Sequence, residues 1–495
     1  ALFRSASAEV PEEDEDDWED TRDDELLKLS LLQDLDGDSY QLHQLVREFL
    51  LAKLEQGEKT ALKGKYCKLM VGIAQQMPQS PTQQLIIQLS PLVSHMEECA
   101  VRWQASLGNE ENELLWPFVF LARFYEGQGA YGDAEPWHVN ALEATRQRFG
   151  DEHPDVATSL NNLAELYRSQ GRYEDAEPLY IDALEMRKML LGERHPSVAT
   201  SLNNLAALYN SQGRYDDAEP LCIDALEMRK KLLGEEHPDI ATSLNNLALL
   251  YESQGRYEDA EPLYIDALEM SKKLLGERHP SVATSLNNLA ELYESQGRYE
   301  DAEPLYIDAL EMRKMLLGER HPSVATSLNN LALLYESQGR YDDAEPLYID
   351  ALEMKKMLLG ERHPSVATSL NNLAALYDSQ GRYDDAEPLQ LKALDIKRHV
   401  LGKKHPSFAI SLGNLASLYV QKGDFSEAES FLYEAWQIFQ QVVGAEHPYT
   451  KETVNRLINL IATAIQANQI DTLSDHPTTQ DLVPKVRAWL ESQSS

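Results

Sequence analysis

Hydrophobic residues recur in one fixed order along most of this chain, with a period of 42 residues. A His-Pro pair opens each period, at residues 153, 195, 237, 279, 321, 363, 405 and 447. When Ala241 is numbered as position 1 of its period, apolar residues occupy positions 4, 7, 8 and 11, which share one face of a helix. A second apolar set occupies positions 20, 24 and 27. Each period therefore predicts two packed helices, A and B, and the repetition predicts a stack of such pairs.

The residues between the apolar sets predict where each helix begins and ends. In the period that starts at His237, helix A should begin near Pro238, because proline at the first helical position loses no hydrogen bond. It should end before Gly255, since glycine suits the left-handed conformation that follows a helix. Helix B should then run to Gly276. Pro262 stands past the first turn of helix B and removes a backbone donor, so we expect a slightly irregular start of this helix in each copy.

The seven apolar positions resemble the signature of the tetratricopeptide repeat. The 42-residue period, the LNNLA segment and the LGExHP connector are similar to the repeats of kinesin light chain and its bacterial relatives. The resemblance implies an all-α fold, a right-handed α-α superhelix, with eight repeats over residues 112–447. The first and last copies depart from the common pattern, as a finite stack requires. Residues 448–495 are expected to form capping helices.

The segment before the repeats has a different character. Residues 9–25 contain twelve acidic residues, which is typical of a solvated loop. Two short apolar stretches, 31–35 and 40–42, flank Asp36-Gly37-Asp38 and predict a β-hairpin, with helices expected at 21–29 and 44–54. Residues 25–54 resemble the winged-helix segment that follows the nucleotide-binding domain of STAND-type (NB-ARC) signalling ATPases. We therefore predict an acidic loop and a partial winged-helix segment over 1–56, and a helical linker over 57–111 with helices at 59–77 and 82–106.

The STAND resemblance implies an ATPase domain upstream of Ala1, and the chain reads as a piece of a longer protein. The chain itself holds no P-loop, because residues 57–65 (GEKTALKGK) have the wrong spacing and Tyr66 replaces the Ser or Thr that would bind the metal. The leading hypothesis is a non-catalytic protein- or peptide-binding scaffold or sensor, the repeat arm of a STAND-type signalling ATPase. The alternative is a free-standing, kinesin light chain-like adaptor with no linked ATPase.

Composition and charge narrow the class of partner. A net charge of −37 disfavours nucleic acid, because phosphate binding depends on Lys and Arg, and it also disfavours anionic membrane surfaces. No apolar run approaches the roughly 20 residues that span a bilayer, and no signal peptide is visible, which favours the cytoplasm. Cys67, Cys99 and Cys222 have unrelated spacing, so the sequence indicates neither a disulfide framework nor a metal site.

The histidines of the His-Pro pairs are the conspicuous candidates for chemistry. Equivalent residues of successive repeats should lie roughly 16–20 Å apart, given interaxial helix distances of about 8–10 Å, whereas zinc needs its ligands within about 2 Å. We therefore expect these histidines to be loop residues that precede each helix A. No Ser/His/Asp or Cys/His set stands out, so no catalytic residue, cofactor or metal is predicted.

The resemblance places the A helices on the concave side of the superhelix. Positions 2, 6 and 9 then share one stripe on helix A with positions 5 and 12 beside it, and positions 9 and 12 vary between copies while the core positions scarcely change. We predict that this stripe binds a protein or peptide. The candidate groove residues are Thr200, Asn203, Asn204, Thr242, Asn245, Asn246, Glu252, Thr284, Asn287, Asn288, Glu291, Glu294, Asn329, Asn330, Glu336, Asn371 and Asn372.

Positions 5 and 6 form an asparagine ladder along the repeats. An amide offers both a donor and an acceptor, so it can hold the backbone of an extended peptide, as the resemblance to kinesin light chain implies for position 6. The alternative is a structural ladder that bonds neighbouring A helices. Residues 237–278 hold eight acidic and four basic residues, so a neutral or basic partner is predicted. Near-identical repeats also allow self-association.

One acidic segment near the N-terminus offers a further alternative. Residues 16–20 (DDWED) resemble the acidic, tryptophan-centred peptides that kinesin light chains bind. An internal segment of this kind would close the groove, but the acidic character of the repeats disfavours it.

Overall fold

The computed structural model describes residues 32–34, 40–42, 56–107 and 113–493. The chain divides into two compact units. The first holds residues up to Met77 together with Pro91–Phe120, and the second holds Pro78–Ser90 together with the chain from Leu121 onward.

Two short strands are described near the N-terminus. Strands β1 (Leu32–Asp34) and β2 (Tyr40–Leu42) pair antiparallel, with Leu32 opposite Leu42. The acidic segment 9–25, which includes residues 16–20, and the helices expected at 21–29 and 44–54 lie outside the described residues. The two strands by themselves do not show the expected winged-helix segment.

The linker contains one long helix and a series of short ones. Helix α4 (Gln56–Gln75) covers the first expected helix. The prediction of a single helix at 82–106 is wrong, since the first α-helix of this segment ends at Leu89. Pro91 follows, and it has no amide hydrogen to donate to the Ile87 carbonyl four residues earlier. The Ser90 hydroxyl donates to the Ile87 carbonyl instead, at 2.9 Å. The pieces are α5 (Gln83–Leu89), the 3₁₀ helix η2 (Ser90–Leu92), α6 (Val93–Glu97), the π-helix η3 (Glu98–Arg102) and the 3₁₀ helix η4 (Gln104–Ser106).

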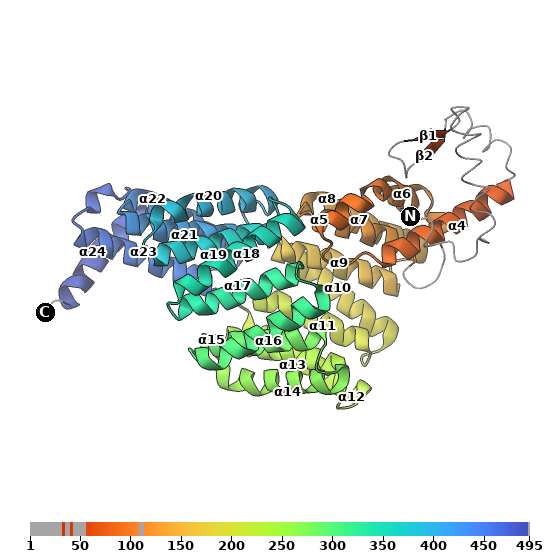
Figure 1. Ribbon diagram of the computed structural model, residues 1–495, viewed down its shortest axis with the longest axis horizontal. Coiled ribbons are helices and arrows are strands. Elements are labelled where there is room, and N and C mark those ends of the chain that lie inside the picture. The colour runs from red at the N-terminus through yellow and green to blue at the C-terminus, as the bar shows by residue number, and fades with distance from the viewer. Residues whose placement is uncertain (1–31, 35–39, 43–55, 108–112, 494–495) are drawn as a thin grey trace. The chain divides into compact units, whose positions relative to one another are not determined.

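Eight helix pairs follow one another in the described residues from 113 onward, and they stack into a helical solenoid (Figure 1). The A helices are α7 (Trp116–Glu126), α9 (Pro154–Ser169), α11 (Pro196–Ser211), α13 (Pro238–Ser253), α15 (Pro280–Ser295), α17 (Pro322–Ser337), α19 (Pro364–Ser379) and α21 (Pro406–Lys422). The B helices are α8 (Tyr131–Phe149), α10 (Tyr173–Leu191), α12 (Tyr215–Leu233), α14 (Tyr257–Leu275), α16 (Tyr299–Leu317), α18 (Tyr341–Leu359), α20 (Tyr383–Val400) and α22 (Phe425–Val442). Helix α23 (Pro448–Gln466), the 3₁₀ helix η5 (Ile470–Thr472) and α24 (Pro477–Gln493) follow.

The ends of the helices follow from the residues that punctuate each repeat. The His237 ring accepts a hydrogen bond from the Asp239 amide at 3.2 Å, and so caps α13. Gly255 and Gly276 have φ of 74° and 86°, which side chains with a Cβ adopt at a cost. The expected irregularity at Pro262 is not seen, since α14 runs continuously through it from Tyr257.

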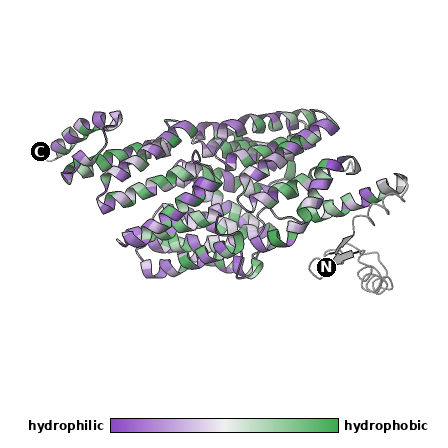
Figure 2. Ribbon diagram, turned by 90° about the horizontal axis from the view of Figure 1, so that it is seen from above, coloured by the Kyte–Doolittle hydropathy of each residue, from purple (hydrophilic) through white to green (hydrophobic). Residues whose placement is uncertain are grey.

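The core repeats in the same way as the sequence. In the fourth repeat the small residues Ala248, Ala260 and Ala267 are fully buried, and Tyr264 is 1 % exposed. Tyr251 at position 11 is only half-buried. Small residues at the crossing of the two helices let them approach, while tyrosine and leucine fill the remaining space. Every array helix therefore carries both hydrophobic and hydrophilic residues (Figure 2).

Successive A helices also contact one another directly, as α11 does with α13, and α13 with α15. Because successive A helices lie this close together, the A-helix side of the stack is the inner side of the curved array. The curvature is strong enough for the array to return on itself. Gly171, after α9, lies next to Pro406 at the start of α21, and the His405 Nε2 atom lies 3.0 Å from the Ser169 carbonyl oxygen. The inner face is therefore bounded by contacts between repeats two and eight.

Candidate functional site

The threonines at position 2 are exposed on the A helices. Each hydroxyl donates to the proline carbonyl one turn earlier, at 3.2 Å for Thr200, 3.3 Å for Thr242 and 3.2 Å for Thr284. These donors are therefore used within their own helices. The Thr200 Oγ1 atom also accepts from Arg229 Nη2 at 3.3 Å.

The asparagines at position 5 mainly join neighbouring A helices. Asn203, Asn287, Asn329 and Asn371 are buried, with exposed fractions of 6–7 %. Their amide groups reach the next repeat: Asn203 donates to Ser243 at 3.5 Å, and Asn371 to Ser411 at 2.8 Å. Asn245 makes the same bond to Ser285 at 3.3 Å. The contacts of the position-5 asparagines are therefore those of a ladder that bonds neighbouring A helices.

The asparagines at position 6 are of two kinds. Asn204, Asn330 and Asn372 donate to the position-5 asparagine of the preceding repeat, at 2.8, 3.0 and 3.1 Å. Asn246 and Asn288 are half-exposed, and among the described residues their amides have no hydrogen-bond partner.

The atoms that could accept hydrogen bonds from Asn246 and Asn288 are also without a partner in the described part of the chain. The Oδ1 atoms of Asn203 and Asn245, which would accept from Asn246 and Asn288, are buried and also lack a partner among the described residues. The ladder is thus open at two adjacent rungs on α13 and α15, and the Oδ1 atom of Asn371 on α19 likewise lacks a partner among the described residues.

Carboxylates line the inner face toward the C-terminal ends of α13, α15 and α17. Glu252 accepts from Tyr264 at 2.9 Å, and Glu294 and Glu336 accept from the corresponding tyrosines at 2.9 and 2.8 Å. Within the described residues, none of these three or Glu291 forms an ion pair with a basic side chain. Burial raises the pKa of Glu252 to about 7, and the nearby Glu291 contributes. Burial likewise raises the pKa of Glu291, Glu294 and Glu336.

Exposed leucines lie beside the open rungs. Leu249 at position 9 of α13 is 48 % exposed, and Leu333 on α17 is 42 % exposed. In the second repeat the same stripe is closed, because Glu165 at position 9 pairs with Arg168 at position 12, with 2.5 Å between the charged atoms. The free polar, apolar and acidic groups therefore coincide in the fourth to sixth repeats.

Two sets of residues that the sequence analysis did not single out also contact the A helices. Arg187, Arg229 and Arg313 on the B helices donate to the position-3 serine of the next repeat at 2.6–2.7 Å. These serines lie near the N-terminal ends of the A helices, so basic groups lie at that end and carboxylates at the other. The recurrence of a basic residue at this position of most copies was the available signal.

The second set is a clamp between repeats. Arg256 stacks over the Tyr251 ring with 3.9 Å between the guanidinium carbon and the ring centre, and both side chains donate to Glu219 of the preceding repeat, at 2.8 and 3.1 Å. The same three residue types recur from Glu135, Tyr167 and Arg172 onward. The invariant GRY and AEP segments were the signal in the sequence.

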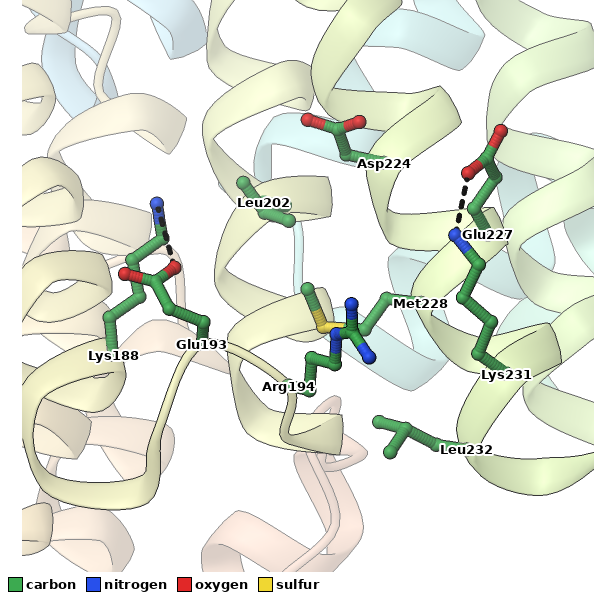
Figure 3. A pocket seen from close by; sticks show the side chains of 9 residues that line it. All are labelled: Lys188, Glu193, Arg194, Leu202, Asp224, Glu227, Met228, Lys231 and Leu232. Atoms are coloured by element: carbon green, nitrogen blue, oxygen red, sulfur yellow. Dashed lines mark hydrogen bonds and ion pairs between the residues drawn. The ribbon is translucent and has the colours of Figure 1, made fainter.

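A small hollow lies on another side of the array, between α10, α11 and α12 (Figure 3). Its volume is about 250 Å³. Four of its charged residues form two ion pairs, Lys188 with Glu193 at 3.8 Å and Lys231 with Glu227 at 3.0 Å, whereas Arg194 and Asp224 form none within the described residues. None of the predicted groove residues lines this hollow.

The His-Pro histidines act as helix caps, as His153 and His321 show by accepting from the second following amide at 3.1 Å. In the described part of the chain no group of three or more His, Cys, Asp or Glu residues could hold a metal ion. None of the described helices combines the length and apolar character needed to cross a membrane.

Comparisons with solved structures found several repeat proteins. A structure of BtubC (BKLC) from P. vanneervenii is 28 % identical over 46 % of this chain and 91 % of that chain, with a TM-score of 0.39. A putative kinesin light chain from Podosopora anserina with nearly identical TPR-like repeats is 28 % identical over 41 % and 97 %, with a TM-score of 0.36. A Rap protein complexed with Competence and Sporulation Factor is 15 % identical over 83 % and 99 %, with a TM-score of 0.47.

Sequence models of protein families identify the repeats directly. No curated protein matches the chain in sequence. A tetratricopeptide repeat model matches residues 113–189, 197–273, 239–315, 281–357, 323–399 and 365–441, and a second such model matches 161–231. These matches cover well over half of the chain and coincide with the observed helix pairs. The chain therefore belongs to the tetratricopeptide repeat family.

Proposed function

We propose that the inner face of the array binds an extended segment of a partner protein, centred on α13 and α15. Tetratricopeptide repeat proteins are generally non-catalytic scaffolds that bind proteins or peptides. This proposal depends on one observation: the side-chain amides of Asn246 and Asn288, beside the exposed Leu249, have no hydrogen-bond partner in the part of the chain that the structure describes. An extended backbone presents donors and acceptors at regular intervals and would complete this open ladder.

The chemistry of the partner follows from the groups around the open rungs. Leu249 offers a contact for one apolar side chain, and no basic side chain of the described residues pairs with the carboxylates of Glu252, Glu291 and Glu294. A basic side chain would supply that charge, whereas an acidic one would add repulsion. We therefore propose a segment that carries Lys or Arg together with an apolar residue.

The placement of the ligand is tested with matched pairs of asparagines. The double variant Asn246→Ala/Asn288→Ala should weaken binding of a fluorescent, unstructured Lys/Leu peptide about 30-fold, because each of the two lost hydrogen bonds costs about 1 kcal/mol. Asn330→Ala/Asn372→Ala changes the same position where the amides already pair with the ladder, and it should leave the affinity nearly unchanged. Fluorescence anisotropy measures both. If the wild type and both double variants bind the peptide with equal affinity, the proposed groove is wrong. If both variants lose the same amount of affinity, the ligand is not centred on α13 and α15.

The charge preference is tested with a Glu/Leu peptide of the same length and with pH. We expect the Lys/Leu peptide to bind more tightly, and Glu252→Gln/Glu294→Gln to reduce that preference by roughly tenfold. Glu269→Gln/Glu311→Gln, on the exposed faces of α14 and α16, is the control.

The sign of the pH effect follows from Glu252, whose pKa of about 7 lies above its ordinary value. A basic ligand favours the ionised carboxylate, so binding releases a proton. The affinity should therefore rise as the pH increases through about 7. An affinity that is constant or falls across this range would contradict the role of Glu252.

The larger context is a separate part of the proposal. We propose that this array is the sensor or scaffold arm of a STAND-type signalling ATPase, which is supported by the resemblance of residues 25–54 alone. The free-standing adaptor is the alternative. Sequencing the gene upstream of the codon for Ala1 distinguishes them, since a P-loop there is required by the first and its absence supports the second.

A further inference from the structure

Two cysteines with unrelated positions in the sequence lie together in the first compact unit. Cys67 lies on α4 and Cys99 on the π-helix η3. Their Sγ atoms are 3.9 Å apart and share a hydrogen bond, and both side chains are fully buried. Both are free thiols. A disulfide bond is about 2.05 Å long, so the two sulfurs are neighbours that need to move about 2 Å closer to bond.

The two sulfurs have different surroundings, and these surroundings change the pKa of each thiol. The hydrogen bond with Cys99 lowers the pKa of Cys67 despite its burial, and Lys63 one turn earlier on α4 adds to this effect. The same hydrogen bond, with burial, raises the pKa of Cys99. The hydrogen bond between the two sulfurs therefore favours a pair that has lost one proton, and the remaining thiol donates to the thiolate. A thiolate beside a second thiol is the arrangement found in redox-active pairs.

We propose that Cys67 and Cys99 form a redox modification site, in which a hydroperoxide converts the dithiol to a reversible intramolecular disulfide. The site joins α4 to η3 and is separate from the peptide groove. Cys222, buried alone on α12 with a pKa raised to about 11, lacks a thiol partner and provides an internal control.

The reaction balances in two steps. The Cys67 thiolate attacks one oxygen of hydrogen peroxide, the O–O bond breaks, and the product is a sulfenic acid with loss of water after proton transfer. The Cys99 sulfur then attacks the Cys67 sulfur, a second water leaves, and the S–S bond forms. The two thiols are oxidised and one peroxide is reduced to two water molecules. An added dithiol reduces the bond again by exchange.

The structural consequence is a covalent link within the linker. The chain between the two cysteines includes α5, η2 and α6, and Pro78, Pro81 and Pro91 interrupt its helical structure. The disulfide would close this segment of the chain into a loop. Closing a loop removes conformational entropy from the unfolded chain, so oxidation should protect this segment from local unfolding.

The experiment uses the full chain under native conditions. After treatment with stoichiometric hydrogen peroxide, the intact mass should fall by two hydrogen atoms, and peptide mapping should show Cys67 linked to Cys99 within one chain. Cys222 should stay alkylatable after unfolding, with a reaction at least about tenfold slower, since one pKa unit changes the thiolate fraction tenfold. Dithiothreitol should restore the original mass.

Single cysteine variants test whether the oxidation requires Cys67 and Cys99 and does not require Cys222. Cys67→Ser and Cys99→Ser should each abolish the loss of two hydrogens, and Cys222→Ser should retain it. The wild-type mapping remains decisive if a buried serine impairs folding. Three alkylatable thiols after peroxide treatment, a cross-link between two chains, or overoxidised Cys67 without a link to Cys99 would each overturn the proposal.

Discussion

At the scale of single residues, the same three side chains fasten each repeat to the one before it. Arg256, Tyr251 and Glu219 form a stacked and hydrogen-bonded clamp across the boundary between α12 and α13. The clamp is partly exposed, so its ion pair contributes less than a buried one would. Its carboxylate, however, accepts from two donors at once, and the identical geometry recurs along the array. Because the clamp recurs at successive boundaries between repeats, its modest contributions add up to a larger stabilisation of the array.

Removal of one carboxylate charge tests the clamp. Glu219→Gln should lower the free energy of unfolding by about 1–2 kcal/mol, because it weakens two hydrogen bonds to a charged acceptor. Glu269→Gln, on the exposed face of the following B helix, is the matched control and should change stability little. Urea unfolding measures both variants. Coincident unfolding curves would show that the clamp does not stabilise the array.

At the scale of helices, the A helices from α9 to α21 begin in the same way. A histidine ring nitrogen accepts the second following amide, and proline occupies the first helical position. This cap requires the neutral ring, since a protonated histidine has no acceptor. At His363 burial, assisted by the nearby Lys355, lowers the pKa to about 4. The start of α19 is therefore sensitive to acid.

The acid dependence has a definite sign. An unfolded histidine titrates near 6.5, so between this pH and about 4 the unfolded chain binds a proton that folded His363 does not. Stability must fall as the pH decreases through that window. His363→Asn keeps a capping acceptor but cannot titrate. It should match the wild type at neutral pH and lose part of the decline in melting temperature at acid pH. Parallel melting curves for both proteins across the window would contradict this assignment.

At the scale of the array, contacts between distant repeats set the curvature. The turn after α9 packs against the start of α21, and the turn after α11 packs against His447 and Pro448 at the start of α23. The His405 ring uses both nitrogens there, with Nδ1 accepting from Ser407 at 2.9 Å and Nε2 donating to Ser169 at 3.0 Å. These contacts bound the inner face that contains the proposed groove.

Two glycines with the same backbone geometry test this closure. A Cβ at Gly171 would lie 2.6 Å from Pro406 and 3.3 Å from the His405 ring, whereas a Cβ at Gly297 would meet nothing within 4 Å. Their φ angles are 70° and 73°, so alanine costs similar backbone strain at both. Gly171→Ala should therefore separate the two turns and increase the radius of gyration in small-angle scattering, while Gly297→Ala should not. Identical scattering from both variants would argue against closure.

The sequence alone determined the repeat, the helix pairs and most of the buried positions, because local periodicity dictates which face of a helix is apolar. The limits of each helix from Pro238 to Gly276 followed from proline, histidine and glycine for equally local reasons. Local signals failed where the periodicity is weak, as in the linker after Pro81, where one helix was expected and several short pieces form.

Tertiary structure decided what depends on neighbours in space. It separated the position-5 asparagines, which bond between helices, from Asn246 and Asn288, which have no partner among the described residues, although all occur in identical LNNLA segments. It raised the pKa of Glu252 by burial and brought Cys67 to within 3.9 Å of Cys99. It also placed repeats two and eight in contact. These features depend on distances between residues far apart in the chain, which a pattern of adjacent residues does not encode.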